Sequence, residues 1–341
     1  MNHGAPDFDP SALVRDYGDV EGEVAACRTA TALFDFSFMF AARVSGPGGL
    51  AAVARLTDRR LDDLPPGRIR YALSRGHDGW LRSDITVWNE GAGRYLVMSG
   101  HRGDIADLIA LARSGGHLGS VDDLGGRTAV FSVQGPGALR ALDGLLDAER
   151  LAAVPYFGFT RLEIEGTSCL VGRLGYTGER GFEIVLEGAM RKTLWRELAA
   201  RARPGGFAAV DCLRIEAGLV LFANEFRLPV TPAEAGLDRF AAPDPGPARC
   251  RLACFRAESD DDPVAWRPAG DPARPEPGTI TVTSACRSAL AGGILGLGYV
   301  PAGEAGPDRA FIDPAGRFRE IRTLPLPFHD PGKRRPRGDW R

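Results

Sequence analysis

Hydrophobic residues recur along the chain with two different periods, and the two periods predict helices and strands in alternation. Spacings of three and four residues, typical of a helix with one buried face, occur in 104–113 and 192–202. A looser apolar stripe predicts a helix over 11–33 with Ser11 as its cap, and 50–56 is also predicted to be helical. Strands are predicted at 40–44, 68–74, 80–88, 94–98, 127–133, 159–164, 168–174, 182–187, 279–283 and 294–300. Hairpins that alternate with helices favour α+β lobes over a parallel, doubly wound sheet.

Polar and apolar side chains alternate strictly along the second strand of the first predicted hairpin. One face carries Leu81, Ser83, Ile85 and Val87, and the other carries Arg82, Asp84, Thr86 and Trp88. A two-residue turn at His77-Asp78 would set Tyr71 directly opposite Asp84, whereas a turn at Asp78-Gly79 would make the two residues diagonal neighbours. Either turn predicts a phenol and a carboxylate in one patch. The alternative is an ordinary solvated strand face.

The second predicted hairpin repeats this construction. A turn at Glu179-Arg180 would pair Tyr176 with Glu183. The opposite face, expected to be core, carries Phe182, Ile184 and Leu186. Glycines suited to close approach of the backbone surround the turn at Gly175, Gly178 and Gly181. Glu183 could also be merely solvent-facing, but two hairpins with the same pair of residue types favour a functional site.

Composition narrows the fold and the class of partner. Of the 341 residues, 44 are Gly and 25 are Pro, about a fifth of the chain, which disfavours a bundle of long helices. The length is enough for two or three domains. Lys and Arg number 42 against 44 Asp and Glu. This near-balance argues against a general polyanion binder such as a nucleic-acid-binding protein, and a local basic patch remains open.

The sequence predicts a cytoplasmic protein without a membrane anchor or a metal site. No apolar run reaches the roughly 18 residues of a membrane span, and the N-terminus lacks the basic start and apolar core of a signal peptide. With no export signal, the six scattered cysteines are expected to be reduced thiols. Cys250 and Cys254 are the one close pair, and no nearby Cys or His pair supplies further zinc ligands.

The C-terminal part differs in composition from the rest. Residues 258–278 are rich in Pro and acidic groups, which predicts a surface connection. The strands that follow predict a small β domain over 247–341. The basic tail 329–341 carries five Lys or Arg against two Asp, and a solvated C-terminus is favoured over contact with an anion.

Motifs of several enzyme classes are missing from the sequence. G-x-S-x-G, a Walker loop and H-E-x-x-H do not occur. The glycines of 291–298 do not lead from a strand into a helix, so dinucleotide binding is not supported.

An ordered set of motifs resembles one known family. GRLGYTGERGFEI (172–184) is similar to the signature of the glycine-cleavage T-protein family of folate-dependent aminomethyltransferases. Further matches, over nearly the whole chain, lie at 34–37, 44–47, 67–73, 78–87, 132–136, 211–219, 231–237, 283–284 and 297–301. Ser-Asp-Ile-Thr-Val (83–87) and Pro-Phe-His-Asp-Pro (327–331) are closer to the folate-binding halves of sarcosine and dimethylglycine dehydrogenases, whose flavin domain this chain lacks.

The chain departs from the T-protein pattern at four places. It has Ser37-Phe38-Met39 for Ser-His-Met, Ser83-Asp84 for a double Asp, Ser99-Gly100 near the usual Asn, and Val210 for an Arg. These departures favour a stand-alone relative over a housekeeping enzyme of glycine cleavage.

The resemblance implies an α+β fold of three domains, arranged as a cloverleaf around a central folate channel. Segments 1–46 and 126–213 would form one α+β lobe, segments 47–125 and 214–246 would form the other, and 247–341 would form a β-barrel-like domain.

The resemblance also implies a tetrahydrofolate site lined by Tyr71, Asp84, Arg173, Tyr176 and Glu183. Glu183 would accept hydrogen bonds from the pterin amino group and ring N–H, and the two tyrosines would supply ring contacts and hydroxyls. Asp84 would be the catalytic residue near N5 and N10, where a carboxylate can take a proton or stabilise a cation.

The implied function is a tetrahydrofolate-dependent one-carbon transferase for a small N-methyl or aminomethyl donor, with a separate dehydrogenase or carrier protein as a candidate partner. One alternative is a folate-dependent O- or S-demethylase. Another is a non-enzymatic folate-binding protein that supports iron–sulfur protein maintenance. Those relatives carry Lys-Gly-Cys-Tyr, and the Arg173-Leu174-Gly175-Tyr176 of this chain, without the Cys, disfavours that class.

Overall fold

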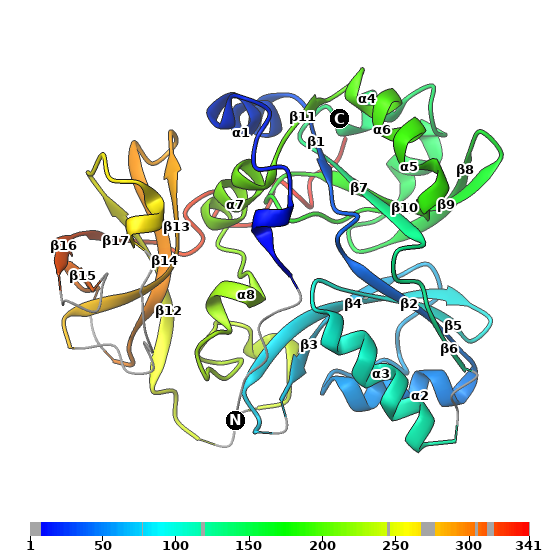
Figure 1. Cartoon of the computed structure of the whole chain (residues 1–341), viewed down its shortest axis with the longest axis horizontal. Helices are drawn as coiled ribbons and strands as arrows, with labels where there is room; N and C mark the ends of the chain where they lie inside the picture. The colour runs from blue at the N-terminus through cyan, green and yellow to red at the C-terminus, as the bar shows by residue number, and fades with distance from the viewer. Residues whose placement is uncertain are drawn as a thin grey trace.

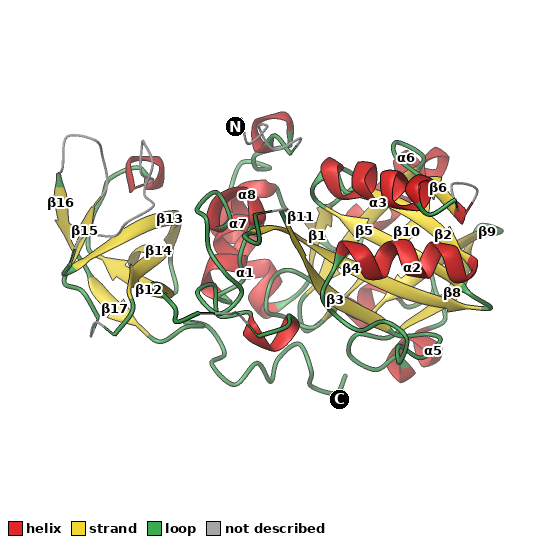
Figure 2. Cartoon of the chain, turned by 90° about the horizontal axis from the view of Figure 1, so that it is seen from below, coloured by secondary structure: helices red, strands yellow, loops and turns green. Residues whose placement is uncertain are grey.

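The computed structural model describes residues 8–76, 78–116, 120–243, 246–266, 277–303, 306–311 and 317–340. Within these residues the chain forms three β-sheets with helices packed around them (Figure 1, Figure 2). The predicted mixed α+β fold is confirmed. His77, in one of the two predicted turns, and 267–276 of the predicted connection lie outside the described residues.

The first sheet has six strands in the order β11-β1-β7-β10-β9-β8. They are β1 (Ala32–Asp35), β7 (Thr128–Gln134), β8 (Phe159–Ile164), β9 (Thr167–Gly172), β10 (Gly181–Glu187) and β11 (Arg203–Pro204). Phe182, Ile184 and Leu186 of β10 pack on one face against Leu194 and Leu198, as the alternation predicts. The helices of this layer are α4 (Ala138–Leu142), α5 (Ala148–Ala153) and α6 (Arg191–Ala199) (Figure 1).

The second sheet has five strands in the order β3-β4-β5-β2-β6. They are β2 (Phe40–Ser45), β3 (Ile69–Arg75), β4 (Leu81–Gly91), β5 (Arg94–Ser99) and β6 (Val121–Asp123). Helices α2 (Gly46–Leu56) and α3 (Arg102–Ser114) cover one face and bury Val53, Ile105 and Leu108. α2 begins before the predicted residue 50, with Pro47 in its first turn, where the missing proline N–H leaves no helical hydrogen bond unmade.

The C-terminal sheet has six strands in the order β16-β15-β13-β14-β12-β17. They are β12 (Cys250–Ala257), β13 (Thr279–Ser288), β14 (Gly293–Pro301), β15 (Arg309–Phe311), β16 (Phe318–Glu320) and β17 (Arg322–Leu324). Trp266 stacks on Phe255 with ring centroids 5.7 Å apart inside this part of the protein. All six cysteines of the chain are buried free thiols.

Three helices lie between the C-terminal sheet and the other two sheets (Figure 2). They are α1 (Val20–Thr29), α7 (Phe207–Glu216) and α8 (Phe222–Glu225). Arg214 of α7 is fully buried and donates to Asp211 Oδ1 at 2.7 Å, to Glu225 Oε2 at 2.9 Å and to Ser284 Oγ at 2.6 Å. The guanidinium of Arg214 therefore links α7 to α8 and to β13 of the C-terminal sheet.

The predicted helix over 11–33 is wrong in its first half. The chain makes a short 3-10 turn at Pro10–Ala12, and α1 begins only at Val20. Gly18 has a positive φ of 98°, which no regular helix accommodates. The carboxylate of Asp19 then caps the helix by accepting from the Gly22 N–H at 2.9 Å.

The basic tail, predicted to be solvated, instead docks against the first sheet. Trp340 stacks on Phe182 with ring centroids 4.8 Å apart and an interplanar angle of 11°. Arg335 Nε donates to Glu179 Oε2 at 2.8 Å, and His329 Nε2 lies 2.9 Å from Glu179 Oε1. The tail is held because it covers an aromatic ring and supplies cationic partners to a buried carboxylate.

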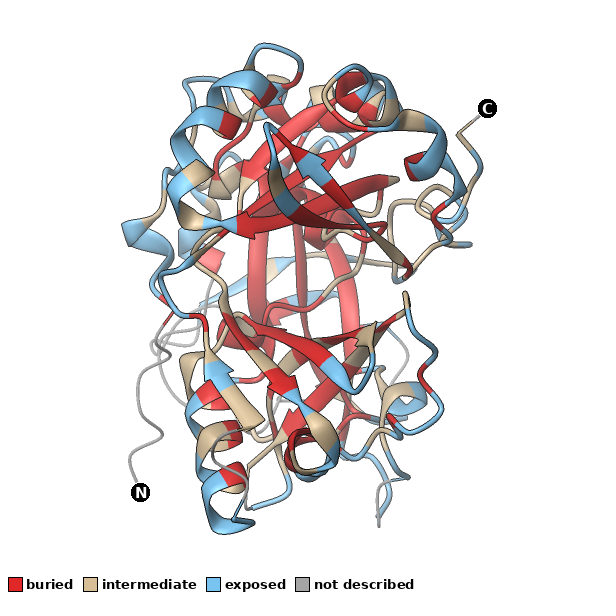
Figure 3. Ribbon diagram, turned by 90° about the vertical axis from the view of Figure 1, so that its right-hand side faces the viewer, coloured by how far each residue is buried: buried red, intermediate tan, exposed pale blue. Residues whose placement is uncertain are grey.

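In Figure 3 the strands of the first and second sheets are mostly buried, while the helices on their outer sides keep exposed flanks. Within the described ranges, no helix combines the length and the apolar character needed to cross a lipid bilayer.

Candidate active site

Tyr71 and Asp84 lie on the neighbouring strands β3 and β4 and contact each other. The ladder sets Leu73 opposite Asp84 and Tyr71 opposite Thr86, so Tyr71 and Asp84 are diagonal neighbours. This is the register expected of a turn at Asp78-Gly79, the second of the two predicted alternatives. The Tyr71 hydroxyl lies near enough to the Asp84 carboxylate to stabilise its negative charge. The predicted patch of a phenol and a carboxylate is confirmed.

The carboxylate of Asp84 is unusually basic. Burial is the main cause that raises its pKa to about 6, and the nearby negative charge of Asp104 raises it further, while the Tyr71 hydroxyl acts in the opposite direction. Asp104 is itself fully buried on α3, where Ser83 Oγ and Ser99 Oγ each donate to its Oδ2 at 2.6 Å. A carboxylate with a pKa near 6 is still mostly ionised at neutral pH and is a stronger base than an exposed Asp.

The second hairpin forms, because β9 and β10 pair as antiparallel neighbours, but Tyr176 does not pair with Glu183. The predicted tight turn at Glu179-Arg180 and its register are therefore wrong. β9 ends at Gly172, which lies opposite Glu183, and residues 173–180 form a loop. The loop folds closely over Gln134, because a Cβ on Gly175 would lie 2.1 Å from Gln134 Oε1. The predicted close approach at Gly175 is therefore made to a side chain of this protein.

Tyr176 nevertheless belongs to the group around Asp84. Burial raises the pKa of Tyr176 well above its ordinary value, and the negative charge of Asp84 contributes. The pKa of Tyr71 is raised in the same way, first by burial and then by Asp84, with a smaller effect of Tyr176. The Tyr176 hydroxyl donates to the Val220 carbonyl oxygen. Two neutral phenols and one basic carboxylate therefore lie together.

Glu183 is a buried carboxylate without a partner. Its exposure is 7%, and burial alone raises its pKa to about 7. No hydrogen bond or ion pair to its carboxylate occurs among the described residues. Ser132, opposite Glu183 on β7, has a buried hydroxyl that is also unpartnered in this part of the chain. Trp88 of the second sheet packs against Gly172, the neighbour of Glu183 on the other side, so this face points towards β4.

The guanidinium of Arg173 makes its contacts with other parts of the chain. Its guanidinium donates to the Val154 carbonyl at 3.1 Å and to the Gly338 carbonyl, and it lies 5.2 Å over the Trp340 ring. The contacts of Arg173 therefore hold the C-terminal tail.

Comparison with known proteins shows the family to which the chain belongs. Residues 10–244 match the model of the GCVT N-terminal domain. The aminomethyltransferase of Moorella thermoacetica is 34% identical over 237 residues, which take in 67% of this chain but only 64% of that enzyme. The aminomethyltransferase of Rubrobacter xylanophilus is 31% identical over 357 aligned positions, 97% of this chain and 92% of the relative. The chain belongs to the T-protein (GCVT) family.

A solved T-protein has the same fold. The glycine cleavage system aminomethyltransferase T of Bartonella henselae superposes with a TM-score of 0.74 over 95% of this chain and 94% of that one, at 24% identity. The resemblance inferred from the sequence motifs is confirmed at the level of family and fold.

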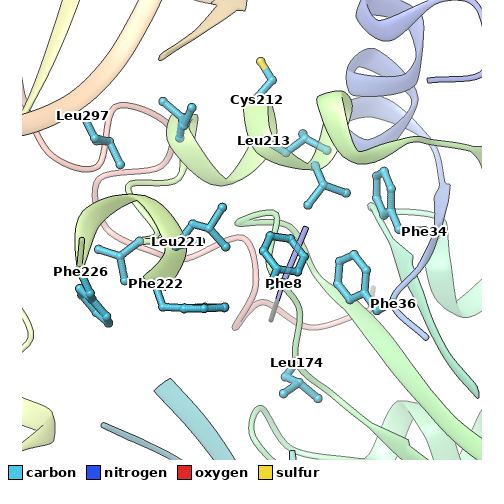
Figure 4. Close-up of a cluster of buried hydrophobic side chains, with 14 of the residues drawn as sticks. Phe8, Phe34, Phe36, Leu174, Cys212, Leu213, Leu221, Phe222, Phe226 and Leu297 are labelled. Atoms are coloured by element: carbon cyan, nitrogen blue, oxygen red, sulfur yellow. The ribbon is translucent and has the colours of Figure 1, made fainter. Parts of the chain in front are cut away.

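Two departures from the T-protein pattern have a visible structural role. Ser83 replaces the first residue of the double Asp, and its hydroxyl contacts the buried Asp104 carboxylate. Phe38 replaces the His, and its ring centroid lies 5.0 Å from that of Phe8 and 5.8 Å from that of Phe36. Figure 4 shows Phe8 and Phe36 within the central apolar cluster.

Sequence reasoning missed three residues near the candidate residues Tyr71 and Asp84. Asp104 lies in the first turn of α3, and the sequence pattern there indicates only an amphipathic helix. Phe240 packs edge-on against Tyr71 at 4.9 Å, and Arg59 Nη1 donates to the Tyr71 carbonyl at 2.6 Å. Phe240 and Arg59 lie outside the strands, where no periodicity marks a position. In the described part of the chain, no group of three or more His, Cys, Asp and Glu side chains could hold a metal ion.

Proposed function

We propose that this protein is an enzyme that transfers a one-carbon unit to tetrahydrofolate from a small N-methyl or aminomethyl donor. Membership of the T-protein family and the aminomethyltransferase names of its relatives support the reaction class. The observation that carries the proposal is the Glu183 carboxylate, which is 7% exposed and has no partner within the described residues. Such a group is stabilised by a ligand that brings hydrogen-bond donors.

Glu183 is proposed to bind the pterin. Its two oxygens can accept parallel hydrogen bonds from a ring N–H and an exocyclic amino group, a pair of donors that a pterin presents on one edge. The Ser132 hydroxyl beside it is a second polar group that such a ligand could satisfy. Hydrogen bonds to the ionised carboxylate would lower the pKa of Glu183 from about 7, so binding and deprotonation of Glu183 would be coupled.

Asp84 is proposed to be the catalytic base. Tetrahydrofolate, when bound, supplies the nitrogen atoms that carry the one-carbon unit. With a pKa of about 6, the Asp84 carboxylate can accept a proton from an attacking amine or oppose a developing positive charge. The Tyr71 phenol stabilises the ionised form of this carboxylate, and the raised pKa of Tyr71 keeps that phenol neutral.

The three sheets support a proposed three-domain cloverleaf around a folate channel. Segments 1–46 and 126–213 would form one lobe, segments 47–125 and 214–246 the other, and 247–341 the C-terminal domain. β2 (Phe40–Ser45) pairs with β5 of the second sheet, so the boundary proposed at residue 46 is better set before Phe40.

Titration with tetrahydrofolate tests the proposal. Binding should raise the Tm of the wild type, since a ligand at a hundred times its Kd adds about 2.7 kcal/mol to stability. Glu183→Gln should weaken binding, because an amide presents its own N–H to one of the two pterin donors. Glu163→Gln, on the exposed side of β8 in the same sheet, is the matched control and should bind normally. Equal affinity in the wild type and Glu183→Gln would remove Glu183 from the site, and no binding by the wild type would overturn the function.

Product analysis separates this reaction from its alternatives. Methylenetetrahydrofolate is expected from an aminomethyl donor, or from an N-methyl donor that a separate dehydrogenase has first oxidised by two electrons to the iminium. Methyltetrahydrofolate would instead indicate an O- or S-demethylase, which transfers the methyl group without oxidation. Binding without turnover of any such donor would favour a folate-binding protein.

A further inference from the structure

A buried carboxylate lies behind the proposed catalytic base, on the other face of the second sheet. Asp104, in the first turn of α3, is fully buried. Its Oδ2 accepts from Ser83 Oγ and Ser99 Oγ, each at 2.6 Å, and its Oδ1 accepts from Arg82 Nη2 at 2.7 Å. Because successive side chains of a strand point to opposite faces, Ser83 faces α3 and Asp84 faces away from it. The strand β4 therefore separates the two carboxylates.

The contacts of Asp104 hold two neighbouring strands at the level of Asp84. Ser83 immediately precedes Asp84 on β4, and Ser99 of β5 lies opposite Ile85, the residue that follows it. The Ser99 hydroxyl has one proton, and its 2.6 Å bond to Asp104 is much shorter than its 3.5 Å distance to the Asp84 carbonyl oxygen. Asp104 thus ties β4 and β5 to α3 immediately before and after Asp84.

The charges around Asp104 do not cancel. Arg82 forms an ion pair with Asp104, and the same guanidinium also pairs with Asp107. Two carboxylates share one guanidinium, so this group of three side chains keeps one net negative charge. Asp107 is half-exposed and water screens its charge, whereas Asp104 is shielded from solvent.

A charge is not needed to join α3 to the sheet. Between them, Ile85, Val97, Ile105 and Leu108 already form an apolar core. Burying a carboxylate in such surroundings has a high desolvation cost, and apolar side chains of similar volume often provide the same packing without it. The negative charge of Asp104 therefore points to a role beyond packing.

Three titratable groups act on Asp84 from three different elements. Tyr71 of β3 and Tyr176 of the 173–180 loop stay neutral, because burial raises the pKa of both phenols. Asp104 acts from α3 as a negative charge, which raises the pKa of Asp84 beyond the effect of burial and against the effect of Tyr71. The charge on α3 thus makes Asp84 a better proton acceptor.

We propose that Asp104 is a positioning residue for the reaction, which holds the strands on either side of Asp84 and makes Asp84 a stronger base through its negative charge. This inference rests on the proposed function. In the proton transfer, the N–H bond of the attacking amine breaks, the electron pair stays on nitrogen, and the proton forms an O–H bond with the Asp84 carboxylate. Protonation of Asp84 removes its repulsion from Asp104, so the transfer is favoured.

The test measures the ionisation of Asp84 directly, in the free full-length protein and without a donor. Carbon NMR follows aspartate side chains labelled with ¹³C at the carboxyl group, and Asp84→Asn identifies the Asp84 signal by its loss. In the wild type the midpoint should lie at about 6. Asp104→Asn keeps the volume and can still hydrogen-bond to both serines, but it lacks the charge, so the midpoint should fall to about 5. The rise of the single-turnover rate with pH should move by the same amount.

Two further variants separate charge from structure. Arg82→Gln removes the cation and leaves both carboxylates, so it should move the Asp84 midpoint upwards, and it tests the inference even if Asp104→Asn fails to fold. Damage to packing alone would not shift the midpoint in opposite directions. Asp107→Asn is the matched control on the same helix, with the same partner. Because water screens the charge of Asp107, its removal should move the midpoint much less than Asp104→Asn does.

The outcomes separate this inference from the proposed function. Unchanged midpoints in Asp104→Asn and Arg82→Gln, with tetrahydrofolate still bound, would refute the role of Asp104 and leave the proposed function intact. A shift in the same direction in both variants would also refute it. If the wild type bound no tetrahydrofolate, the proposed function would fail, and the role of Asp104 in the reaction would fail with it.

Discussion

Glu179 and Glu183 lie four residues apart in the chain, and both are buried, but their surroundings are opposite. Burial alone would raise the pKa of Glu179, but hydrogen bonds from His329 and Arg335 and the charge of Arg28 lower it. No hydrogen bond or nearby cation in the described part of the chain offsets the burial of Glu183, and the pKa of its carboxyl group rises to about 7. Glu179 is therefore an anchor satisfied by its own protein, whereas Glu183 has no such partner among the described residues.

Asp84 lies between these two extremes. It has one partner, Tyr71, and one like-charged neighbour, Asp104, and its pKa is raised to about 6. The three carboxylates together show that burial by itself does not mark a functional residue. The number of partners inside the protein separates an anchor from a candidate ligand or base.

The largest effect is expected where a carboxylate takes part in the reaction. Asp84→Asn keeps the volume and removes the base, so single-turnover transfer with saturating tetrahydrofolate should slow by 10²–10⁴-fold, about 3–5 kcal/mol in the barrier. The wild-type rate should rise with pH through about 6, as Asp84 ionises, and the variant should lose this rise. Tm and folate affinity should change much less. If the variant kept the wild-type rate, Asp84 would have no catalytic role, and the β3–β4 hairpin would be only structural.

The next largest effect is expected on the stability of the protein, when Glu179 is replaced. Glu179→Gln should destabilise the protein by about 3 kcal/mol in urea unfolding at pH 7, because it leaves Arg28 and Arg335 without this carboxylate. The folded-state pKa of Glu179 is lowered, so its contribution is present at neutral pH and is lost as the pH falls through that lowered value. Wild type and variant should converge in acid. Equal stability at pH 7 would contradict the anchoring role.

Glu183→Gln is expected to stabilise the protein, whereas Glu179→Gln is expected to destabilise it. The folded-state pKa of about 7 lies above the ordinary value of 4.5, so the wild type loses stability as the pH rises through about 7. The variant has no such loss, and without folate it should be more stable than the wild type by about 2–3 kcal/mol at pH 8 and equally stable near pH 4. Urea unfolding at the two pH values checks this. A destabilised variant at pH 8 would mean that Glu183 already has an internal partner.

Local patterns were enough to predict most strands and the placement of Tyr71 beside Asp84. Strict alternation in β4 predicted that Asp84 shares a sheet face with Tyr71 of β3. Side chains of a strand alternate with a period of two, and either of the two turns considered keeps these residues on the same face. The motif resemblance then supplied the family. The pairing of Tyr176 with Glu183 failed because it assumed a tight turn, whereas residues 173–180 form a loop over Gln134.

Long-range contacts could not be predicted from local patterns. The docking of Trp340 on Phe182 joins the end of the chain to β10, and no periodicity carries that information. The same holds for Asp104, which reaches Ser83 from a different element. Such contacts depend on how the elements pack, and they decide here which carboxylates have partners.

The most direct test of the central claim is the number of protons released when tetrahydrofolate binds at pH 7. Calorimetry in buffers of different ionisation enthalpy measures it. With a pKa of about 7, Glu183 is about half protonated in the free protein, and hydrogen bonds from the pterin should drive the proton off. The wild type should therefore release about half a proton per site more than Glu183→Gln does. If the two proteins released equal numbers of protons while both bound folate, the claim that Glu183 binds the pterin would be contradicted.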